Sequence, residues 1–307
     1  MGLETNIEWC DSTVNPSTGC DGCELWNGRD IRVCYAGNLH EARLAKSMPT
    51  LYAENFQEVR LAPGRMMEAA RWPDLRGKER PDKPWLNGLP RMIFVGDMGD
   101  FGSRDVPGDY FIHEIIGAIR STAGARHFWL LLSKQISRLA KLSAQIGGLP
   151  NNCMALTTIT SQRTAEVRRQ ELLNVECRWR GISIEPLWEP LDLTERGRGL
   201  YCESCLDRSA HWCVDPVIDW VIVGGESGAN AKPTSPAWIR DIVAQCADAN
   251  VPCFVKQLGA DWAKQASASH KKGGDPAEWP SDLRVRQVPQ AITTFQRPSP
   301  RAKEYCG

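Results

Sequence analysis

Three cysteines near the start of the chain, Cys20, Cys23 and Cys34, have the residue type and the spacing that metal chemistry requires. The residues before the first of them, 15 to 19, favour turns, so the cysteines are expected on a loop. Three thiolates can bind a metal or an iron–sulfur cluster and leave one coordination position open for a reactant. The alternative is a structural zinc site in which Cys10 supplies a fourth thiolate and closes the coordination sphere.

A second set of metal-ligand residue types lies in residues 194–216, where it interrupts the step between two expected strands. A C-x-x-C pair is followed there by a histidine and another cysteine, a combination typical of a zinc knuckle. The four residues are Cys202, Cys205, His211 and Cys213. We expect this Cys-rich insertion to hold either Zn2+ or a second iron–sulfur cluster, and the alternative is a reduced thiol cluster in a surface loop.

Composition limits the class of protein. The chain has 307 residues and 12 cysteines, and its 37 basic residues balance 37 acidic ones. This balance argues against nucleic-acid binding through bulk positive charge, although a local basic groove remains compatible with it. The N-terminus lacks a signal-peptide pattern and no apolar run reaches ~18 residues, so we expect a cytoplasmic protein without membrane contact. Clustered cysteines in that compartment indicate metal or redox chemistry.

Short apolar runs alternate with segments of helical periodicity along most of the chain. Strands are expected at residues 92–96, 127–133, 153–159, 179–184, 217–223 and 252–256. Helices are expected at residues 110–121, 134–146, 162–173 and 238–249. The alternation predicts an α/β fold with a parallel sheet, as a partial or closed (β/α) barrel or, alternatively, as a doubly wound open sheet.

Polar residues and glycines gather directly after these expected strands. They are Asp97, Asp100, Ser133, Lys134, Glu185, Gly224, Gly225, Glu226 and Lys256. The carboxyl ends of the strands build the active site of α/β barrels, so these residues are candidates for binding a cofactor or substrate. The alternatives are ordinary: carboxylates cap turns, a lysine extends along the surface, and loops are polar in any case.

Two further segments depart from the α/β pattern. Residues 62–90 are rich in proline, arginine and glycine and are expected to form an irregular excursion. Residues 264–307 are polar and are expected to form a C-terminal extension that is partly disordered. The main domain is therefore placed at residues 1–263, with the Cys-rich insertion inside it.

A series of motifs along the chain resembles the phage Gp37/Gp68 family (DUF5131). The motifs are IEWCDSTVNPSTGC, CYAGNLHEARL, RMIFVGDMGDF, ISIEPLWEPLDL, IDWVIVGGESGANAKP, FVKQLG and GGDPAEWPSDLRV, and they cover about residues 6 to 289. That family is similar to radical SAM enzymes, which carry a three-cysteine 4Fe–4S cluster on a β/α barrel. The resemblance therefore implies a barrel of radical SAM type.

The resemblance also implies a cofactor set. Cys20, Cys23 and Cys34 would hold a 4Fe–4S cluster whose fourth iron binds S-adenosylmethionine (SAM), and a flavodoxin or ferredoxin would supply the electron. The spacing here is C-x2-C-x10-C, whereas the radical SAM signature is C-x3-C-x2-C. The loop after residues 92–96, with Asp97 and Asp100, occupies the place of the glycine-rich SAM loop of those enzymes.

These observations predict an enzyme that cleaves SAM reductively to modify a nucleic acid or a nucleotide-type substrate. The substrate class follows from the phage association of the family and from two basic segments, residues 71–83 and 168–180. The alternative is a non-catalytic protein, stabilised by zinc or an iron–sulfur cluster, that binds nucleic acid or a host protein. In that case the Cys-rich insertion would be the binding module.

Overall fold

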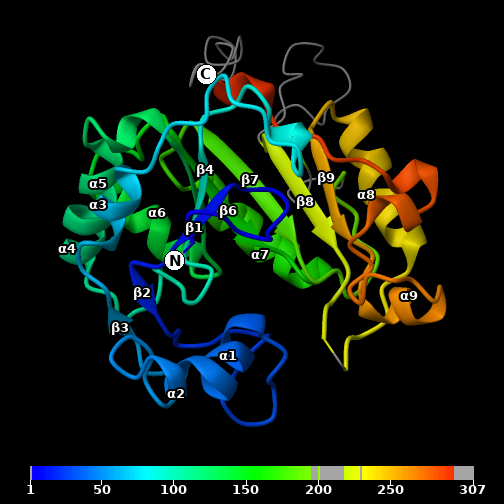
Figure 1. Cartoon of the computed structure of the whole chain (residues 1–307), viewed down its shortest axis with the longest axis horizontal. Coiled ribbons are helices and arrows are strands. Elements are labelled where there is room, and N and C mark those ends of the chain that lie inside the picture. Colours follow the sequence, from blue (N-terminus) through cyan, green and yellow to red (C-terminus); the bar gives the residue numbers. More distant parts are fainter. Residues whose placement is uncertain (1, 195–199, 201–217, 229, 294–307) are drawn as a thin grey trace. The chain divides into compact units, whose positions relative to one another are not determined.

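A computed structural model describes residues 2–194, 200, 218–228 and 230–293 of the chain (Figure 1). The chain divides into two compact units. Unit 1 comprises residues 1–80, 87–155 and 175–178, and unit 2 comprises residues 81–86, 156–174 and 179–307. Strand β6 (Cys153–Thr158) belongs to both, because the division falls in its middle.

Unit 1 is built on parallel strands. β1 (Ser12–Val14) pairs with β4 (Met92–Val95), and β4 pairs with β5 (Phe128–Leu132). Helices α3 (Arg65–Ala70), α4 (Gly108–Tyr110), α5 (Gly117–Arg120) and α6 (Ile136–Gln145) belong to the same unit, together with the π-helix η3 (Phe111–Ile116) and the 3-10 helix η4 (Gly124–Arg126). All four residues of β4 are buried, which explains why this strand reads as a continuous apolar run.

A small lobe of unit 1 follows β1. It contains a two-stranded antiparallel pair, β2 (Ser17–Thr18) with β3 (Arg60–Leu61). Between these strands lie α1 (Tyr35–Leu39), the π-helix η1 (His40–Leu44) and α2 (Ala45–Ser47). The lobe has its own apolar cluster, formed by Trp26, Ala36, Tyr52, Phe56 and Met98.

Unit 2 contains the parallel strands β7 (Trp179–Ile184), β8 (Trp220–Gly224) and β9 (Cys253–Gln257), paired in that order. Its helices are α7 (Gln162–Leu173), α8 (Pro236–Asp248) and α9 (Ala260–Gln265), with short 3-10 helices at Pro84–Leu86 (η2), Pro276–Glu278 (η6), Ser281–Leu283 (η7) and Gln290–Thr293 (η8). Helix α7 begins with a capping box of Ser161 and Thr164, and α8 begins with Ser235 as its cap and a proline at its first turn.

The last described segment is anchored to unit 2 by an arginine among aromatic rings. The guanidinium of Arg286 lies 4.5 Å from the ring centroid of Trp85, 5.3 Å from that of Trp279 and 5.5 Å from that of Phe254. Each such contact is attractive because the ring face is electron-rich. Trp279 and Phe254 are buried, so residues 276–293 are part of the packed unit.

The expected α/β fold with a parallel sheet is confirmed. The strand order is β1-β4-β5-β6-β7-β8-β9. The pairs β1–β4, β4–β5, β7–β8 and β8–β9 are parallel. Sequence reasoning missed β1, and it began β8 at residue 217 although the strand starts at Trp220. Residues 62–90 are not wholly irregular, since they contain α3 and η2. None of the described helices is long and apolar enough to cross a membrane.

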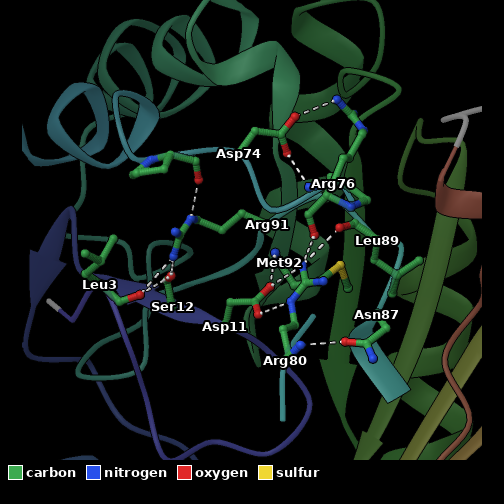
Figure 2. A network of polar contacts seen from close by, with 12 residues as sticks. Leu3, Asp11, Ser12, Asp74, Arg76, Arg80, Asn87, Leu89, Arg91 and Met92 are labelled. Carbon is green, nitrogen blue, oxygen red and sulfur yellow. Dashed lines mark hydrogen bonds and ion pairs between the residues drawn. The ribbon is translucent and has the colours of Figure 1, made fainter. Parts of the chain in front are cut away.

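A network of buried polar contacts holds the amino ends of β1 and β4 together (Figure 2). The Arg80 guanidinium donates from Nε to Asp11 Oδ1 over 2.7 Å and from Nη2 to Asp11 Oδ2 over 3.3 Å, a two-point ion pair between buried groups. Arg80 also donates to the carbonyls of Leu89 and Pro90, and the Met92 N–H donates to Asp11 Oδ2 over 2.8 Å. The pair therefore attaches the segment before β4 to the residue that precedes β1.

Replacement of Asp11 tests this network. Asp11→Ala leaves the Arg80 guanidinium buried without its carboxylate and should lower the free energy of unfolding by about 3–5 kcal/mol. Urea denaturation followed by circular dichroism measures the change. The matched control is Asp105→Asn at an exposed carboxylate, which should leave the midpoint nearly unchanged. An Asp11→Ala protein as stable as the control would contradict the assigned role.

A buried histidine makes unit 1 sensitive to acid. His127 is fully buried, its Nε2–H donates to the Ala70 carbonyl over 3.1 Å, and its Nδ1 has no hydrogen-bond partner among the described residues. Burial lowers the pKa of His127 from 6.5 to about 4. Between these two values the unfolded chain binds the proton and the folded chain does not, so stability falls as the pH falls.

We therefore expect the free energy of unfolding to decrease by up to about 3 kcal/mol between pH 6.5 and pH 4 because of this residue. His127→Gln keeps a side-chain N–H and removes the titrating group. Its unfolding free energy, measured by urea denaturation at a series of pH values, should fall less steeply over that window. Equal slopes for the two proteins would rule out His127 as the source.

Candidate functional site

The candidate site in unit 1 is the loop that carries the three cysteines. The loop leaves β2 and enters α1, for which Cys34 is the residue at the helix start. It is held by backbone hydrogen bonds: the Cys20 N–H donates to the Phe56 carbonyl over 2.9 Å, and the Gly19 N–H donates to the Met98 carbonyl over 3.2 Å. A Cβ at Gly19, which has φ of +84°, would overlap the Glu58 backbone, so glycine is required at this close approach.

The sulfur atoms lie in a partly buried environment with backbone donors. The Gly22 N–H donates to Cys20 Sγ and the Leu25 N–H donates to Cys23 Sγ, each over 3.4 Å. Cys20 and Cys34 pack against the apolar cluster of the lobe. Hydrogen bonds to sulfur and exclusion of water are two means by which proteins tune metal–thiolate centres.

The three thiols also interact with one another electrostatically. Burial raises the pKa of Cys20, and the carboxylate of Asp100 and the thiol of Cys23 raise it further. Burial likewise raises the pKa of Cys23; the ammonium of Lys134 opposes this rise, and Cys34 adds to it. Cys23 therefore interacts electrostatically with both Cys20 and Cys34. Because three thiolates would repel one another, a positive charge is needed nearby if all three are to be deprotonated together.

Asp100 joins the loop after β4 to the end of β5. Its Oδ1 accepts hydrogen bonds from the Ser133 hydroxyl over 2.6 Å and from the Gly102 N–H over 2.8 Å, and its Oδ2 accepts one from the Lys134 N–H over 2.9 Å. The Gln135 amide donates to the Gly22 carbonyl over 3.2 Å. The structure therefore brings together Asp100, Ser133 and Lys134, as the strand-end pattern predicts.

Asp97 also follows β4 and bonds to Asn15, the residue after β1. Asn15 donates to Asp97 Oδ1 over 2.6 Å and accepts from the Met98 N–H over 2.9 Å. Burial raises the pKa of Asp97, while the Asn15 amide opposes this. Sequence reasoning missed Asn15 and Gln135 as site residues, although each directly follows a strand or a predicted strand-end residue. Asn15 directly follows β1, so a prediction of that strand would have identified it as a strand-end residue.

Three thiols on one loop, two of them with N–H donors, suit a metal or iron–sulfur cluster in donor chemistry. Within the part of the chain that the structure describes, no group of three His, Cys, Asp or Glu side chains has converged on a metal-binding geometry. Cys202, Cys205, His211 and Cys213 lie outside the described residues. Cys10, the alternative fourth ligand, is fully buried.

The other predicted residues belong to unit 2. Lys256 Nζ lies 2.9 Å from Glu185 Oε1 in a partly buried ion pair, and Glu226 accepts a hydrogen bond from the indole of Trp188. A Cβ at Gly225 would overlap the Leu258 carbonyl, and one at Gly224 would lie 3.2 Å from Glu185 Oε1. Close packing of the chain against itself thus explains the glycines without a ligand.

The family of the chain follows from a comparison of its whole sequence. Residues 4–283 match the model of DUF5131, a family described as a protein of unknown function. The chain belongs to this family. No curated protein and no solved structure matches the chain.

Ser133 and Ser103 offer a matched test of the Asp100 network. Both hydroxyls are buried, but Ser133 donates to Asp100 whereas Ser103 Oγ has no partner among the described residues. Ser133→Ala should lower the free energy of unfolding by about 1–2 kcal/mol, since it leaves the carboxylate short of a donor. Ser103→Ala should be neutral or slightly stabilising in the same urea titration. Equal effects of the two substitutions would contradict the role given to Ser133.

Proposed function

We propose that this protein is an iron–sulfur enzyme of radical SAM type that modifies a nucleic acid or nucleotide-type substrate. The observation that supports this most directly is the grouping of Cys20, Cys23 and Cys34 on the loop between β2 and α1, with Asp100 and Lys134 beside them. The loops that follow β1, β4 and β5 supply these residues, and active sites of α/β proteins form at the carboxyl ends of parallel strands.

The order of the elements supports the proposal as well. The cysteine loop follows the first strand of the sheet, and the neighbouring strand β4 is followed by the loop with Asp97 and Asp100. Gly19 and Gly99 form a parallel bridge between the two loops. We propose that the seven-stranded sheet is a partial β/α barrel of the radical SAM type.

In this proposal the three cysteines hold a 4Fe–4S cluster with one iron free for SAM. Cluster and SAM together would supply reductive cleavage of a C–S bond. The residues of this chain would position the cluster and exclude water from it. The Gly22 and Leu25 N–H groups donate to two of the sulfur atoms, and Cys20 and Cys34 pack against the apolar cluster.

Asp100 and Lys134 would hold the polar end of the ligand. Asp100 is fixed by three donors, so its carboxylate is ready to accept from an amine without reorganising. The ammonium of Lys134 acts on Cys23 and can pair with a carboxylate. Under the same proposal a flavodoxin or ferredoxin would be the electron donor, and Cys202, Cys205, His211 and Cys213 would hold zinc or a second cluster.

Metal analysis and a product assay on protein purified without oxygen test the proposal. About four irons and four sulfides per chain are expected for the cluster on the three cysteines, and additional iron if the Cys-rich insertion holds a second cluster; 5′-deoxyadenosine is expected after reduction with dithionite in the presence of SAM. Cys20→Ala, Cys23→Ala and Cys34→Ala should each lose both the iron and the product. Cys177→Ala, at a half-buried cysteine outside the group, is the control and should retain both.

Two results would go against the proposal in different ways. A full cluster in Cys23→Ala would show that Cys23 is not a ligand. Zinc in place of iron, with no 5′-deoxyadenosine, would exclude the enzyme and favour a metal-stabilised protein that binds nucleic acid or a host protein.

A further inference from the structure

A second group of polar side chains lies in unit 2, after β7 and β8. The Trp188 indole N–H donates to Glu226 Oε2 over 2.6 Å. The ammonium of Lys232 lies 4.1 Å from the centroid of the same indole ring. A ring face, a carboxylate and an ammonium therefore converge at one place.

The indole is held in position by the chain around it. The Leu187 N–H donates to the Gly224 carbonyl over 3.0 Å, and the Trp188 N–H donates to the Thr160 carbonyl over 3.3 Å. The Thr234 hydroxyl donates to the Leu187 carbonyl over 3.0 Å. A preorganised aromatic side chain loses little entropy when a ligand stacks on it.

Glu226 has an unused acceptor. The residue is only 7% exposed, one carboxylate oxygen accepts from the indole, and the other has no hydrogen-bond partner among the described residues. The second oxygen keeps some contact with solvent, so a ligand can reach it. The second oxygen is therefore suited to accept an N–H from a bound molecule.

The charges narrow the class of that molecule. Lys232 is exposed and its ammonium lies against the Trp188 ring, whereas the ammonium of Lys256 is paired with Glu185. Among the described residues, Lys232 therefore supplies the positive charge of this group. An organic cation on the indole would have to displace Lys232 and then lie beside another ammonium. A planar base that carries a phosphate can use all three groups, since the ammonium can turn from the ring to the phosphate.

We infer that Trp188, Glu226 and Lys232 form a nucleotide site in which the base stacks on the indole. An amino N–H of the base donates to the free oxygen of Glu226, and the phosphate pairs with Lys232. The inference rests on the proposed function only where it takes this nucleotide to be part of the substrate; binding itself requires neither a cluster nor SAM.

Isothermal titration calorimetry of the full chain with adenosine 5′-monophosphate tests the site. Adenosine, which lacks the phosphate, should bind at least about fivefold more weakly, and the difference should shrink as salt rises to about 0.3 M. Purine riboside 5′-monophosphate, which lacks the amino group, should bind about tenfold more weakly. SAM carries the same adenosine group without a phosphate, so it should compete with the monophosphate only as weakly as adenosine does.

Three variants assign the contacts. Trp188→Leu should weaken binding of the monophosphate by about tenfold or more, and Glu226→Gln should abolish the preference for the amino group. Lys232→Gln should abolish the preference for the phosphate. Lys264→Gln, at an exposed lysine of α9 outside the group, is the control and should change neither. Circular dichroism melting checks that each variant is folded. If a variant does not fold, the comparison of ligands on the unaltered chain still tests the proposed site.

The same titration separates the sources of the nucleotide. A short single-stranded oligonucleotide that binds about tenfold more tightly than the monophosphate would place the site on a nucleic-acid strand, and equal affinities would indicate a free nucleotide. Undetectable binding of every nucleotide, or equal binding of adenosine and its monophosphate, would overturn the inference. Either result leaves the iron and 5′-deoxyadenosine assays unaffected, so the two proposals fail separately.

Discussion

The position of the cysteine loop depends on the parallel pairing of β1 with β4. β1 has only three residues, so its ladder alone provides few hydrogen bonds. Side chains extend the ladder at both ends: Asp11 accepts from the Met92 N–H before the strand, and Asn15 accepts from the Met98 N–H after it. The side chains of these two residues accept hydrogen bonds in the way that backbone carbonyls do within the ladder. They therefore fix the position at which the chain beyond Asn15 begins.

The dependence of β1 on these side chains also explains which strands of unit 1 could be predicted from the sequence. β4 and β5 are buried along most of their length and read as apolar runs, so they were predicted. Asp100, Ser133 and Lys134 were predicted as candidate binding residues because each was expected at the carboxyl end of a strand. β1 was missed because Ser12 and Thr13 are polar and because its stability comes from partners far away in the sequence, chiefly Arg80 and the start of β4.

The two candidate sites differ in how far sequence could define them. Cysteine spacing identified Cys20, Cys23 and Cys34, but not the N–H donors that bond the sulfurs, since those depend on the turns of the loop. In unit 2, Glu185, Glu226 and Lys256 were predicted as binding residues, yet Glu185 and Lys256 bind each other. Trp188 and Lys232 gave no signal, because a contact between a ring and an ammonium has no characteristic spacing along the chain.

The packing of Arg286 among aromatic rings limits how far the chain can be truncated from its C-terminal end. Arg286 comes late in the chain, and it covers rings contributed by residues as early as Trp85. A truncated chain that ends before Arg286 would expose the aromatic ring faces that this residue covers, and such a chain would be prone to aggregate. Gene shortening at the 3′ end is thus constrained well beyond the last strand, although no candidate site residue lies there.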